Sequence, residues 1–388
     1  MKKIVVVAGE TSGDLHAAGL LKELEKLNQG IQFFGMGGDR MKQAGVELYF
    51  HIRDLSFMGF WEVLKKIGFF RFVLKKMTHL LDKKKPDLAI LVDYPGFNLK
   101  FAKRIKKRGI PILYYISPQI WAWGGKRIEK IKKLVDKMLV VFPFEKKIYE
   151  DAGVDVELIG HPLLDIVKSK TKTEEFRGKL GIRKNELLLG LFPGSRKQEV
   201  SKILPIMLEA GERLAEKIRS ARSGGLKSIK LGISLAPTIK KDYLEGYLAS
   251  TKLDYQIIED INYDLMEHSD FLLVKSGTST LEAAILGTPF VLIYKTGFLS
   301  WLVARGLVKI PYICLANIVA GKRIVEEFIQ YRAKPELVAK AVYELLTDRD
   351  RYEKTKERLL TVKDNLGEKG AYHRGAKIVA ELLNVSGV

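Results

Sequence analysis

The sequence predicts an α/β protein built from two Rossmann-like, doubly wound domains. Near-continuous apolar strands alternate with helical patterns along the first half, which is typical of a parallel sheet covered on both faces. After a polar stretch at residues 168–180 the same alternation begins again. The 388 residues also exceed the roughly 250–300 at which a single core stops growing. With 47% hydrophobic residues the chain can fill two cores, which excludes a disordered protein.

In the first half, each expected strand is a short apolar run, and each expected helix repeats apolar residues every three or four positions. Strands are expected at 4–9, 31–36, 87–93, 111–117 and 137–142, with helices at 14–27, 60–84, 98–108, 126–133 and 144–151. Pro86 closes the long helix, because proline cannot continue the helical hydrogen bonds.

The second half follows the same order. Strands are expected at 187–195, 230–236, 255–259 and 289–294, helices at 199–219 and 239–250, and a strand, turn and helix within 271–287. Helices at 335–347, 350–364 and 371–384 end the chain. We therefore expect an N-terminal domain at 1–167, a C-terminal domain at 168–349, and terminal helices at 350–388. These last helices either pack back on an N-terminal domain or exchange between protomers, which leaves the oligomeric state open, a homodimer included.

Cysteine content and apolar runs restrict the cellular location. The single Cys314 excludes an intrachain disulfide framework and a cysteine-based zinc site, and suits a reducing cytoplasm. The opening MKKIVVVAGE has too short an apolar stretch for a signal peptide and reads as the first strand. No apolar run approaches the ~20 residues of a membrane span. We therefore expect a cytoplasmic protein.

Positive charge is concentrated in one part of the chain. The net charge is +20, and residues 51–140 hold 21 Lys and Arg against 7 Asp and Glu, which gives +14 for this stretch. Such a local excess attracts an anionic partner, either nucleic acid or an acidic membrane surface. No recognised nucleic-acid-binding module occurs, so we expect no nucleic-acid partner.

Within this basic stretch, residues 59–85 mix aromatic and cationic side chains. Such a mixture is typical of a helix that lies in a membrane interface. The alternative is a core helix with a solvated basic face, and the surrounding charge favours the membrane. The residues expected at the membrane are Phe60, Trp61, Lys65, Lys66, Phe69, Phe70, Arg71 and Phe72.

The turn AGETSGD follows the first strand, and ligands of open α/β sheets bind at the carboxyl ends of strands. Glu10 and Asp14 place two carboxylates there, which suits contact with hydroxyl groups or protons, so both are candidate catalytic residues. The glycine spacing is not that of a dinucleotide-binding loop. An ordinary turn, with Ser12 or Asp14 capping the next helix, is the alternative.

A further carboxylate, Asp93, ends the apolar run LAILV. Poor solvation at that place raises a carboxyl pKa and suits the group to accept a proton from an alcohol. The alternative is an aspartate that only shapes the turn before Pro95 and Gly96.

Two turns in the second half suggest a phosphate site. In LFPGSRKQEV, Ser195 is a natural N-cap for the next helix, and Arg196 supplies hydrogen-bond donors at the positive helix end. In VKSGTSTLEAAILG, the small residues Ser276, Gly277 and Thr278 leave backbone amides free to face a phosphate.

Glu282, in the helix after the second turn, can reach sugar hydroxyls, although the helix dipole alone also favours a carboxylate there. Each turn by itself can simply start a helix. Together they predict a nucleotide diphosphate held between two helix N-termini.

Several other chemistries are not expected. No P-loop spacing occurs, so ATP hydrolysis is not expected, and no metal-ligand spacing occurs, so we predict no metal and no cofactor. His161 lies at the expected domain junction and can touch a ligand there, whereas His16 is expected to be structural. Cys314 is expected to be buried and inert.

Taken together, several segments resemble the lipid-A-disaccharide synthase family from about residue 4 to 330. They are AGETSGD, MGFWEVL, DYPGFN, YYISPQIWAWGGKR, FPFE, IGHPLLD, LFPGSR and SGTSTLE. The resemblance implies a GT-B fold, two Rossmann-like domains facing across a cleft, and an inverting, metal-free glycosyltransferase. The implied reaction joins UDP-2,3-diacylglucosamine to 2,3-diacylglucosamine 1-phosphate (lipid X), giving the β-1,6-linked disaccharide 1-phosphate of lipid A biosynthesis and UDP. It takes place at the cytoplasmic face of the inner membrane, where the enzyme is peripherally bound.

The resemblance also implies residue roles. Asp93 would be the general base on the acceptor 6-hydroxyl, and Gly96 stands where some relatives carry a second acid. The acceptor side would be lined by Glu10, Ser12, Gly13, Asp14 and His161. UDP would be held by Ser195, Arg196, Ser276, Gly277, Thr278, Glu282 and Asn317. Rival interpretations with the same fold and UDP site are a transferase that adds GlcNAc to a lipid-linked muramyl peptide and a UDP-GlcNAc 2-epimerase.

Overall fold

The computed structural model describes residues 1–388 except 56–66, 119–126, 222–227, 298–300, 302–309 and 386–388. The chain forms two compact units. Unit 1 contains Met1–Asp165 and Leu366–Val388, and unit 2 contains Ile166–Trp301 and Pro311–Asn365. The C-terminal end of the chain therefore belongs to the same unit as its beginning.

Unit 1 is built on a seven-stranded sheet in the order β3-β2-β1-β4-β5-β6-β7, and every neighbouring pair is parallel. Its central strands are buried along their length, as expected for strands covered on both faces. The strands are β1 (Lys3–Ala8), β2 (Gln32–Gly37), β3 (Glu47–His51), β4 (Leu88–Val92), β5 (Ile112–Tyr115), β6 (Lys137–Val140) and β7 (Val156–Leu158).

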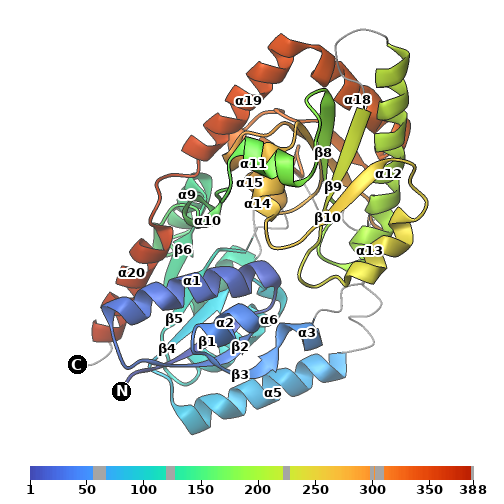
Figure 1. Ribbon diagram of the computed structural model, residues 1–388. Helices are drawn as coiled ribbons and strands as arrows, with labels where there is room; N and C mark the ends of the chain where they lie inside the picture. Colours follow the sequence, from blue (N-terminus) through green and yellow to red (C-terminus); the bar gives the residue numbers. More distant parts are fainter. Residues whose placement is uncertain (56–66, 119–126, 222–227, 298–300, 302–309, 386–388) are drawn as a thin grey trace. The chain divides into compact units, whose positions relative to one another are not determined.

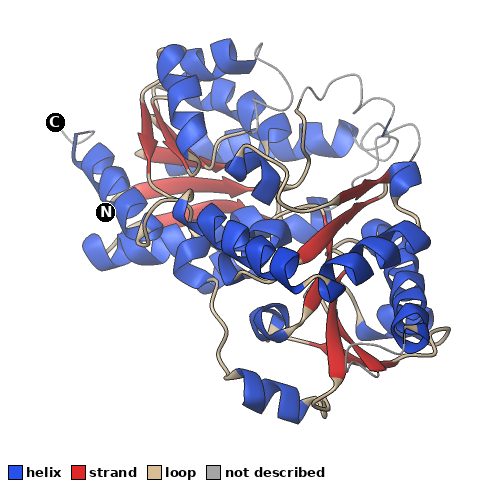
Figure 2. Cartoon of the chain, turned by 90° about the horizontal axis from the view of Figure 1, so that it is seen from above, coloured by secondary structure: helices blue, strands red, loops and turns tan. Residues whose placement is uncertain are grey.

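Helices join the strands of unit 1, and helices lie on both faces of the sheets (Figure 2). The first and last helices, α1 and α20, lie side by side (Figure 1). Gly19 makes this approach possible, since a Cβ there would lie 2.5 Å from the Tyr372 ring. The helices are α1 (Thr11–Leu27), α2 (Asp39–Gln43), α3 (Ile52–Leu55), α5 (Ile67–Lys84), α6 (Pro95–Lys106), α8 (Ile128–Leu134), α9 (Pro143–Asp151), α10 (Leu163–Ile166) and α20 (Ala371–Val385).

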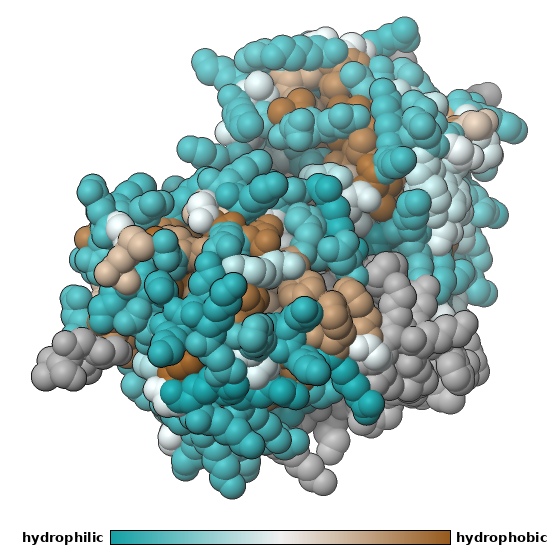
Figure 3. Space-filling model, turned by 90° about the horizontal axis from the view of Figure 1, so that it is seen from below, coloured by the Kyte–Doolittle hydropathy of each residue, from teal (hydrophilic) through white to brown (hydrophobic). Residues whose placement is uncertain are grey.

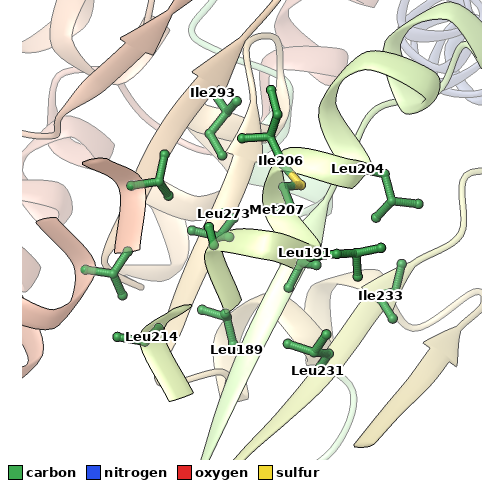
Figure 4. Close-up of a cluster of buried hydrophobic side chains, with 14 of the residues drawn as sticks. Leu189, Leu191, Leu204, Ile206, Met207, Leu214, Leu231, Ile233, Leu273 and Ile293 are labelled. Atoms are coloured by element: carbon green, nitrogen blue, oxygen red, sulfur yellow. The ribbon is translucent and has the colours of Figure 1, made fainter. Parts of the chain in front are cut away.

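Unit 2 is built on a six-stranded parallel sheet in the order β10-β9-β8-β11-β12-β13. Figure 4 shows part of its core, where leucine and isoleucine side chains from the strands meet Leu204, Met207 and Leu214 of α12. The strands are β8 (Glu186–Phe192), β9 (Ser228–Ser234), β10 (Asp254–Ile258), β11 (Phe271–Lys275), β12 (Phe290–Tyr294) and β13 (Glu327–Ile329).

The helices of unit 2 cover this sheet, and α19 packs on α15, α17 and α18. They are α11 (Thr173–Lys179), α12 (Lys197–Ser220), α13 (Lys241–Leu248), α14 (Asn262–His268), α15 (Ser279–Leu286), α17 (Leu315–Ala320), the 3-10 turn η2 (Gln330–Arg332), α18 (Pro335–Thr347) and α19 (Arg349–Asp364). Within the predicted polar stretch 168–180, Phe176 is buried, and Asp264 accepts hydrogen bonds from the backbone N–H groups of Lys170 and Thr171.

Both sheets confirm the predicted doubly wound class, and most predicted major elements agree with the structure to within a few residues. The first part of the helix predicted at 60–84 lies outside the described residues, which contain α5 from Ile67 to Lys84. The short strands β3, β7 and β13 were not predicted. They contain three to five residues and are partly exposed, so their apolar runs are too short to stand out from the surrounding loops.

The strand orders determine where a ligand can bind. In unit 1 the chain moves from β1 outward to β2 and β3, then returns to β4 on the other side of β1. In unit 2, β8 and β11 are related in the same way. Such a reversal opens the loops apart at the carboxyl ends of the two central strands, which is where ligands bind in open α/β sheets.

Candidate active site

Asp93 stands at the reversal point of unit 1, directly after β4. It and Tyr94 adopt left-handed backbone conformations, with φ of 43° and 47°. Pro95 then begins α6 at a position where its missing N–H is not needed. The sharp turn directs the chain from a buried strand into a helix within two residues.

The electrostatic surroundings of Asp93 suit a proton acceptor. Burial raises the pKa of its carboxyl to about 7, and the negative charges of Glu10 and Glu145 add to the effect, while the Tyr94 backbone hydrogen bond opposes it. The raised pKa was predicted from the apolar run that precedes Asp93. A base with a pKa near neutrality combines a usable ionised fraction with a strong driving force for proton transfer.

Glu10 follows β1, the neighbour of β4, and its charge acts on both Asp93 and Tyr94. Burial, and then this charge, raise the pKa of the Tyr94 phenol to about 12. The Tyr94 ring lies over Gly9, where a Cβ would come within 2.2 Å of it. Gly9 belongs to the AGETSGD turn, but sequence analysis did not single out Tyr94 as its partner, because the contact joins two strand ends far apart in the chain.

Asp14, which was predicted as a catalytic group, has a structural task. Its carboxylate accepts hydrogen bonds from the backbone N–H groups of Gly38 (2.6 Å), Arg40 (3.1 Å) and Met41 (3.1 Å). It thereby holds the first turn of α2, and it is 3% exposed. The expected capping of α1 by Ser12 or Asp14 is wrong, because α1 begins after Glu10 and no side chain caps it.

Ser12 is half-buried in the first turn of α1, and Gly13 is buried. A Cβ on Gly13 would make ordinary contacts of 3.5 Å with Ala8 and 3.6 Å with Val92. Gly13 therefore lies against the ends of β1 and β4, next to the Asp93 turn.

His161 is buried in a separate group of rings after β7. Its Nδ1 accepts a hydrogen bond from the Leu163 backbone N–H (3.2 Å), and its ring lies 5.1 Å from Phe142 and 6.2 Å from His16. Burial, and then the neighbouring His16, lower the pKa of His161 to about 3. His16 itself bonds the Tyr372 hydroxyl at 3.0 Å, and burial lowers its pKa to about 4. Both histidines are therefore neutral at physiological pH.

The ends of β5 and β6 add a buried polar pair that sequence analysis missed. Ser117 donates a hydrogen bond to Glu145 at 2.7 Å, and Glu145 also accepts one from the Phe142 backbone N–H at the start of α9. Ile116, between β5 and Ser117, has a φ of 59°, which is rare for a β-branched residue. The motif FPFE was a visible signal for Glu145, but its interaction with Asp93 depends on the strand order.

In unit 2, the PGSR turn after β8 is organised by Glu199. This carboxylate accepts a hydrogen bond from the Ser195 backbone N–H (3.2 Å) and lies 3.6 Å from the Arg196 guanidinium. Gly194 has a φ of 113°, which side chains rarely adopt, and a Cβ there would lie 2.6 Å from the Glu199 carboxylate. The prediction that Ser195 is the N-cap is wrong: Arg196 occupies that position, and its side chain makes no cap hydrogen bond.

Lys275 is a cation that sequence analysis overlooked. It ends β11, beside β8, and its ammonium lies 2.8 Å from Glu199. Glu199 thus connects the Arg196 turn to the Lys275 strand. The residues that follow, Ser276, Gly277 and Thr278, form the predicted turn, with Gly277 at φ of 148°. The only sequence signal for Lys275 was its place directly before SGT.

Glu282 and Asn317 were both predicted to contact the nucleotide. Glu282 lies in the first turn of α15, where it accepts a hydrogen bond from the Tyr263 hydroxyl (3.2 Å), and burial raises its pKa. Asn317 is fully buried, and its amide bonds the backbone of Ile324 and Val325 and the side chain of Glu327. The amide of Asn317 therefore holds the 313–327 region together.

The basic helix α5 has two different faces. Val73, Met77 and Leu81 are buried in the unit 1 core, whereas Arg71 and Phe72 are exposed, Phe72 to 49%. Phe69 and Phe70 pack half-buried at the core edge, and Phe60, Trp61, Lys65 and Lys66 lie outside the described residues. Figure 3, seen from below Figure 1, shows a mainly hydrophilic face with hydrophobic side chains between the polar ones.

In the part of the chain that the structure describes, no helix has both the length and the apolar character of a membrane span. Among the same residues, no three or more His, Cys, Asp or Glu side chains lie together in a way that could hold a metal ion. Cys314 is buried, as predicted, and burial raises its thiol pKa to about 12.

Comparison with known proteins identifies the fold and the family. Solved structures with the same fold include the UDP-GlcNAc 2-epimerase of Neisseria meningitidis bound to UDP-GlcNAc (TM-score 0.61, 14% identity, 99% of this chain and 100% of that chain). Another is the glycosyltransferase of kitacinnamycin (TM-score 0.61, 14% identity, 98% of each chain). These similarities confirm the predicted GT-B class.

The closer similarity is in sequence. The family model of lipid-A-disaccharide synthetase matches residues 4–381. The lipid-A-disaccharide synthase of Nitrosococcus oceani is 42% identical over 380 residues, which is 98% of this chain and 96% of that protein. That of Syntrophus aciditrophicus is 40% identical over 386 residues, 99% of each. The chain belongs to the lipid-A-disaccharide synthase family of glycosyltransferases.

Proposed function

We propose that this enzyme joins UDP-2,3-diacylglucosamine to 2,3-diacylglucosamine 1-phosphate and releases UDP and the β-1,6-linked disaccharide 1-phosphate. The observation that carries the proposal is the family match over residues 4–381. The two strand-end sites support it, because an inverting transfer needs a base on the acceptor and a stabilised leaving group.

Asp93 is the base in this proposal. Its carboxyl has a pKa of about 7, so a substantial fraction is ionised at neutral pH and can take the proton of the acceptor 6-hydroxyl. As the hydroxyl oxygen attacks the anomeric carbon of the donor, the bond from that carbon to the UDP oxygen breaks. Glu10, whose charge raises the Asp93 pKa, lies on the proposed acceptor side with Ser12, Gly13 and His161.

Unit 2 receives the leaving group in this proposal. Negative charge develops on the diphosphate as the bond to the sugar breaks, and fixed donors stabilise such charge without reorganising. Arg196 and Lys275 supply cations, and the 276–278 turn supplies backbone N–H groups at the start of α15. Ser195 and Glu282 are proposed UDP contacts, with Glu282 on the ribose. We assign Asn317 to the support of this region.

We also place the enzyme at the cytoplasmic face of the inner membrane, because both proposed substrates carry acyl chains. The exposed Arg71, Phe72, Lys75 and Lys76 of α5 combine cations with an aromatic ring. Lys76 lies 5.7 Å from the centre of the Phe72 ring. Such a surface suits an anionic lipid headgroup layer.

The test is UDP release from the purified protein with lipid X as acceptor and two donors compared. Release confined to UDP-2,3-diacylglucosamine and dependent on lipid X supports the proposal. Release from plain UDP-GlcNAc without any lipid would instead indicate an epimerase-like or hydrolytic enzyme. Silence with both donors from a folded protein that binds UDP would reject this pair of substrates.

A further inference from the structure

We propose that Asn98 and Tyr114 are positioning residues that hold the Asp93 backbone in its left-handed turn and so aim the Asp93 carboxyl. The inference rests on the proposed function, in which Asp93 is the base. It goes beyond that function because neither residue touches a substrate. Both act through the backbone of Asp93.

The turn at Asp93 is not one that its sequence prefers. Asp93 and Tyr94 have φ of 43° and 47°, a region in which the Cβ of a residue other than glycine crowds the backbone. Aspartate occasionally adopts this conformation as a single residue, whereas a bulky residue such as Tyr94 rarely does. Two consecutive residues of this kind persist only where surrounding contacts determine the conformation.

Asn98 supplies the first contact. It lies on α6, five residues after Asp93, and is 0% exposed. Its Nδ2 donates hydrogen bonds to the backbone carbonyls of Val92 (3.1 Å) and Asp93 (2.7 Å). Its Oδ1 is buried without a hydrogen-bond partner among the described residues. A buried acceptor without a partner is costly. Because the amide keeps an orientation that leaves Oδ1 unpaired, we infer that its two bonds to the carbonyls determine that orientation.

Tyr114 supplies the second contact from the neighbouring strand β5. Its hydroxyl donates to the same Asp93 carbonyl, and its side chain is fully buried. The Asp93 backbone N–H in turn donates to the Tyr115 carbonyl at 3.1 Å. The peptide of Asp93 is therefore held from α6 and from β5, which leaves the carboxyl little freedom to turn away.

In this turn, the Asp93 carboxyl is subject to the negative charges of Glu10 and Glu145. The charged and titratable groups that act on Asp93 are Glu10 after β1 and Glu145 on α9, and Tyr94 acts on it only through a backbone hydrogen bond. Those that act on Tyr114 are Asp93 itself, Tyr149 on α9 and Arg127 before α8. When the turn loosens, the Asp93 carboxyl can move toward water. Its pKa should then fall from about 7 toward the ordinary value of 3.8.

The chain offers a matched pair of variants. Tyr114 and Tyr115 are adjacent in β5, and both side chains are fully buried. The Tyr114 hydroxyl bonds Asp93, whereas the Tyr115 hydroxyl has no hydrogen-bond partner among the described residues. Tyr114→Phe and Tyr115→Phe thus remove the same atom from equally buried positions, and only the first removes a contact to Asp93.

Steady-state kinetics of UDP release tests the proposal. We expect Tyr114→Phe to lower kcat about tenfold with little change in KM, since one hydrogen bond is lost. The acid limb of its kcat/KM profile should move to lower pH. Asn98→Ala should lower kcat further, about 100-fold, because small displacements of a reacting group have effects of this size. Tyr115→Phe should match the parent enzyme in both measurements, and thermal melts check that each variant is folded.

A second readout does not depend on turnover. Carbon-13 NMR of protein labelled at aspartate carboxyl carbons follows the Asp93 titration, with Asp93→Asn identifying its signal. A lower carboxyl pKa in Tyr114→Phe than in Tyr115→Phe supports the proposal, and equal values together with equal kcat overturn it. If Asp93→Asn keeps its turnover while the titration still differs between the two phenylalanine variants, the base assignment fails and the positioning role stands.

Discussion

The two sheets reach the same kind of reversal point with different residues. At the reversal point of unit 1, the left-handed residues after β4 carry side chains, Asp93 and Tyr94, as does Ile116 after the neighbouring strand β5. In unit 2, the corresponding turns use glycine, with φ of 113° at Gly194 and 148° at Gly277. The charges differ as well, since Glu10 and Glu145 act on Asp93, whereas Arg196 and Lys275 meet at Glu199.

This difference teaches what each turn presents to a ligand. Glycine at a strand end removes the side chain and leaves backbone N–H groups accessible, which suits an anion such as a diphosphate. A left-handed residue with a side chain costs free energy, so it is retained where that side chain must point in one direction. The turn of unit 1 therefore fixes the direction of a side chain, and the turns of unit 2 present backbone N–H groups to the ligand.

The largest expected effect on kcat comes from removing the Asp93 carboxylate. Asp93→Asn keeps the shape of the side chain and abolishes its basicity, so kcat should fall about 10²- to 10⁴-fold. UDP affinity and the melting temperature should stay near those of the parent enzyme, because the unit 2 contacts are unchanged. Near-normal turnover with both lipids bound would reject Asp93 as the base.

The pH dependence of kcat/KM is the second test of the difference between the two units. A base works only when ionised, and burial has raised the Asp93 pKa to about 7. Activity is therefore expected above pH 7, and kcat/KM should fall about tenfold per pH unit as the pH drops below it. The measurement is a kcat/KM profile from pH 5 to 9. A profile that stays flat down to pH 5 would contradict the assignment.

The cationic side of the contrast is tested by Lys275→Ala. Loss of an ammonium from the diphosphate site should weaken UDP binding about 10- to 100-fold by calorimetry, and added salt should reduce the difference. Lys184→Ala is the control, since Lys184 is exposed and precedes the opposite end of β8. Equal UDP affinities for the two variants would exclude Lys275 from the site.

A smaller effect on UDP affinity is expected when a side chain is added to the glycine turn at residues 276–278. Gly277 has φ of 148°, so Gly277→Ala is strained although its Cβ would meet only Lys275 Nζ at 3.6 Å. We expect UDP affinity to fall several-fold. Gly246→Ala in α13 is the control, because a Cβ there has open space and alanine favours a helix. Unchanged UDP binding in Gly277→Ala would mean that the turn does not contact the diphosphate.

The smallest effect at neutral pH concerns His16 and His161, whose pKa values burial lowers to about 4 and 3. In the unfolded chain both protonate near pH 6.5, so the unfolded state binds more protons between these values. The free energy of unfolding is therefore unaffected above pH 6.5 and falls as the pH drops below it, by up to a few kcal/mol.

Urea unfolding at pH 7.5 and 5.5 measures this decrease. His161→Phe should reduce it, and His373→Gln should not, because the His373 side chain is 48% exposed. Identical pH dependence in the two variants would show that the buried ring group does not control acid stability.

Local patterns in the sequence already determine the fold class. Strands such as IVVVA and LAILV are buried on both faces, so their apolar character is continuous and easy to recognise. The turns that follow them contain Glu10, Asp93, Arg196 and Gly277, and the rule that ligands bind at strand ends was enough to select these residues. The raised pKa of Asp93 also followed from its position after an apolar run.

Only the tertiary structure distinguishes side chains that can contact a ligand from side chains that support the backbone around the site. Asp14 looks like a second catalytic acid in the sequence, but three backbone N–H groups of the α2 region occupy its carboxylate. Lys275 and Glu199 are 76 residues apart, and their ion pair exists because β11 lies beside β8. Tyr114 reaches Asp93 for the same reason, since β5 lies beside β4. Residue type and spacing select candidates along the chain, whereas strand order decides which of them meet, because contacts between strands are long-range.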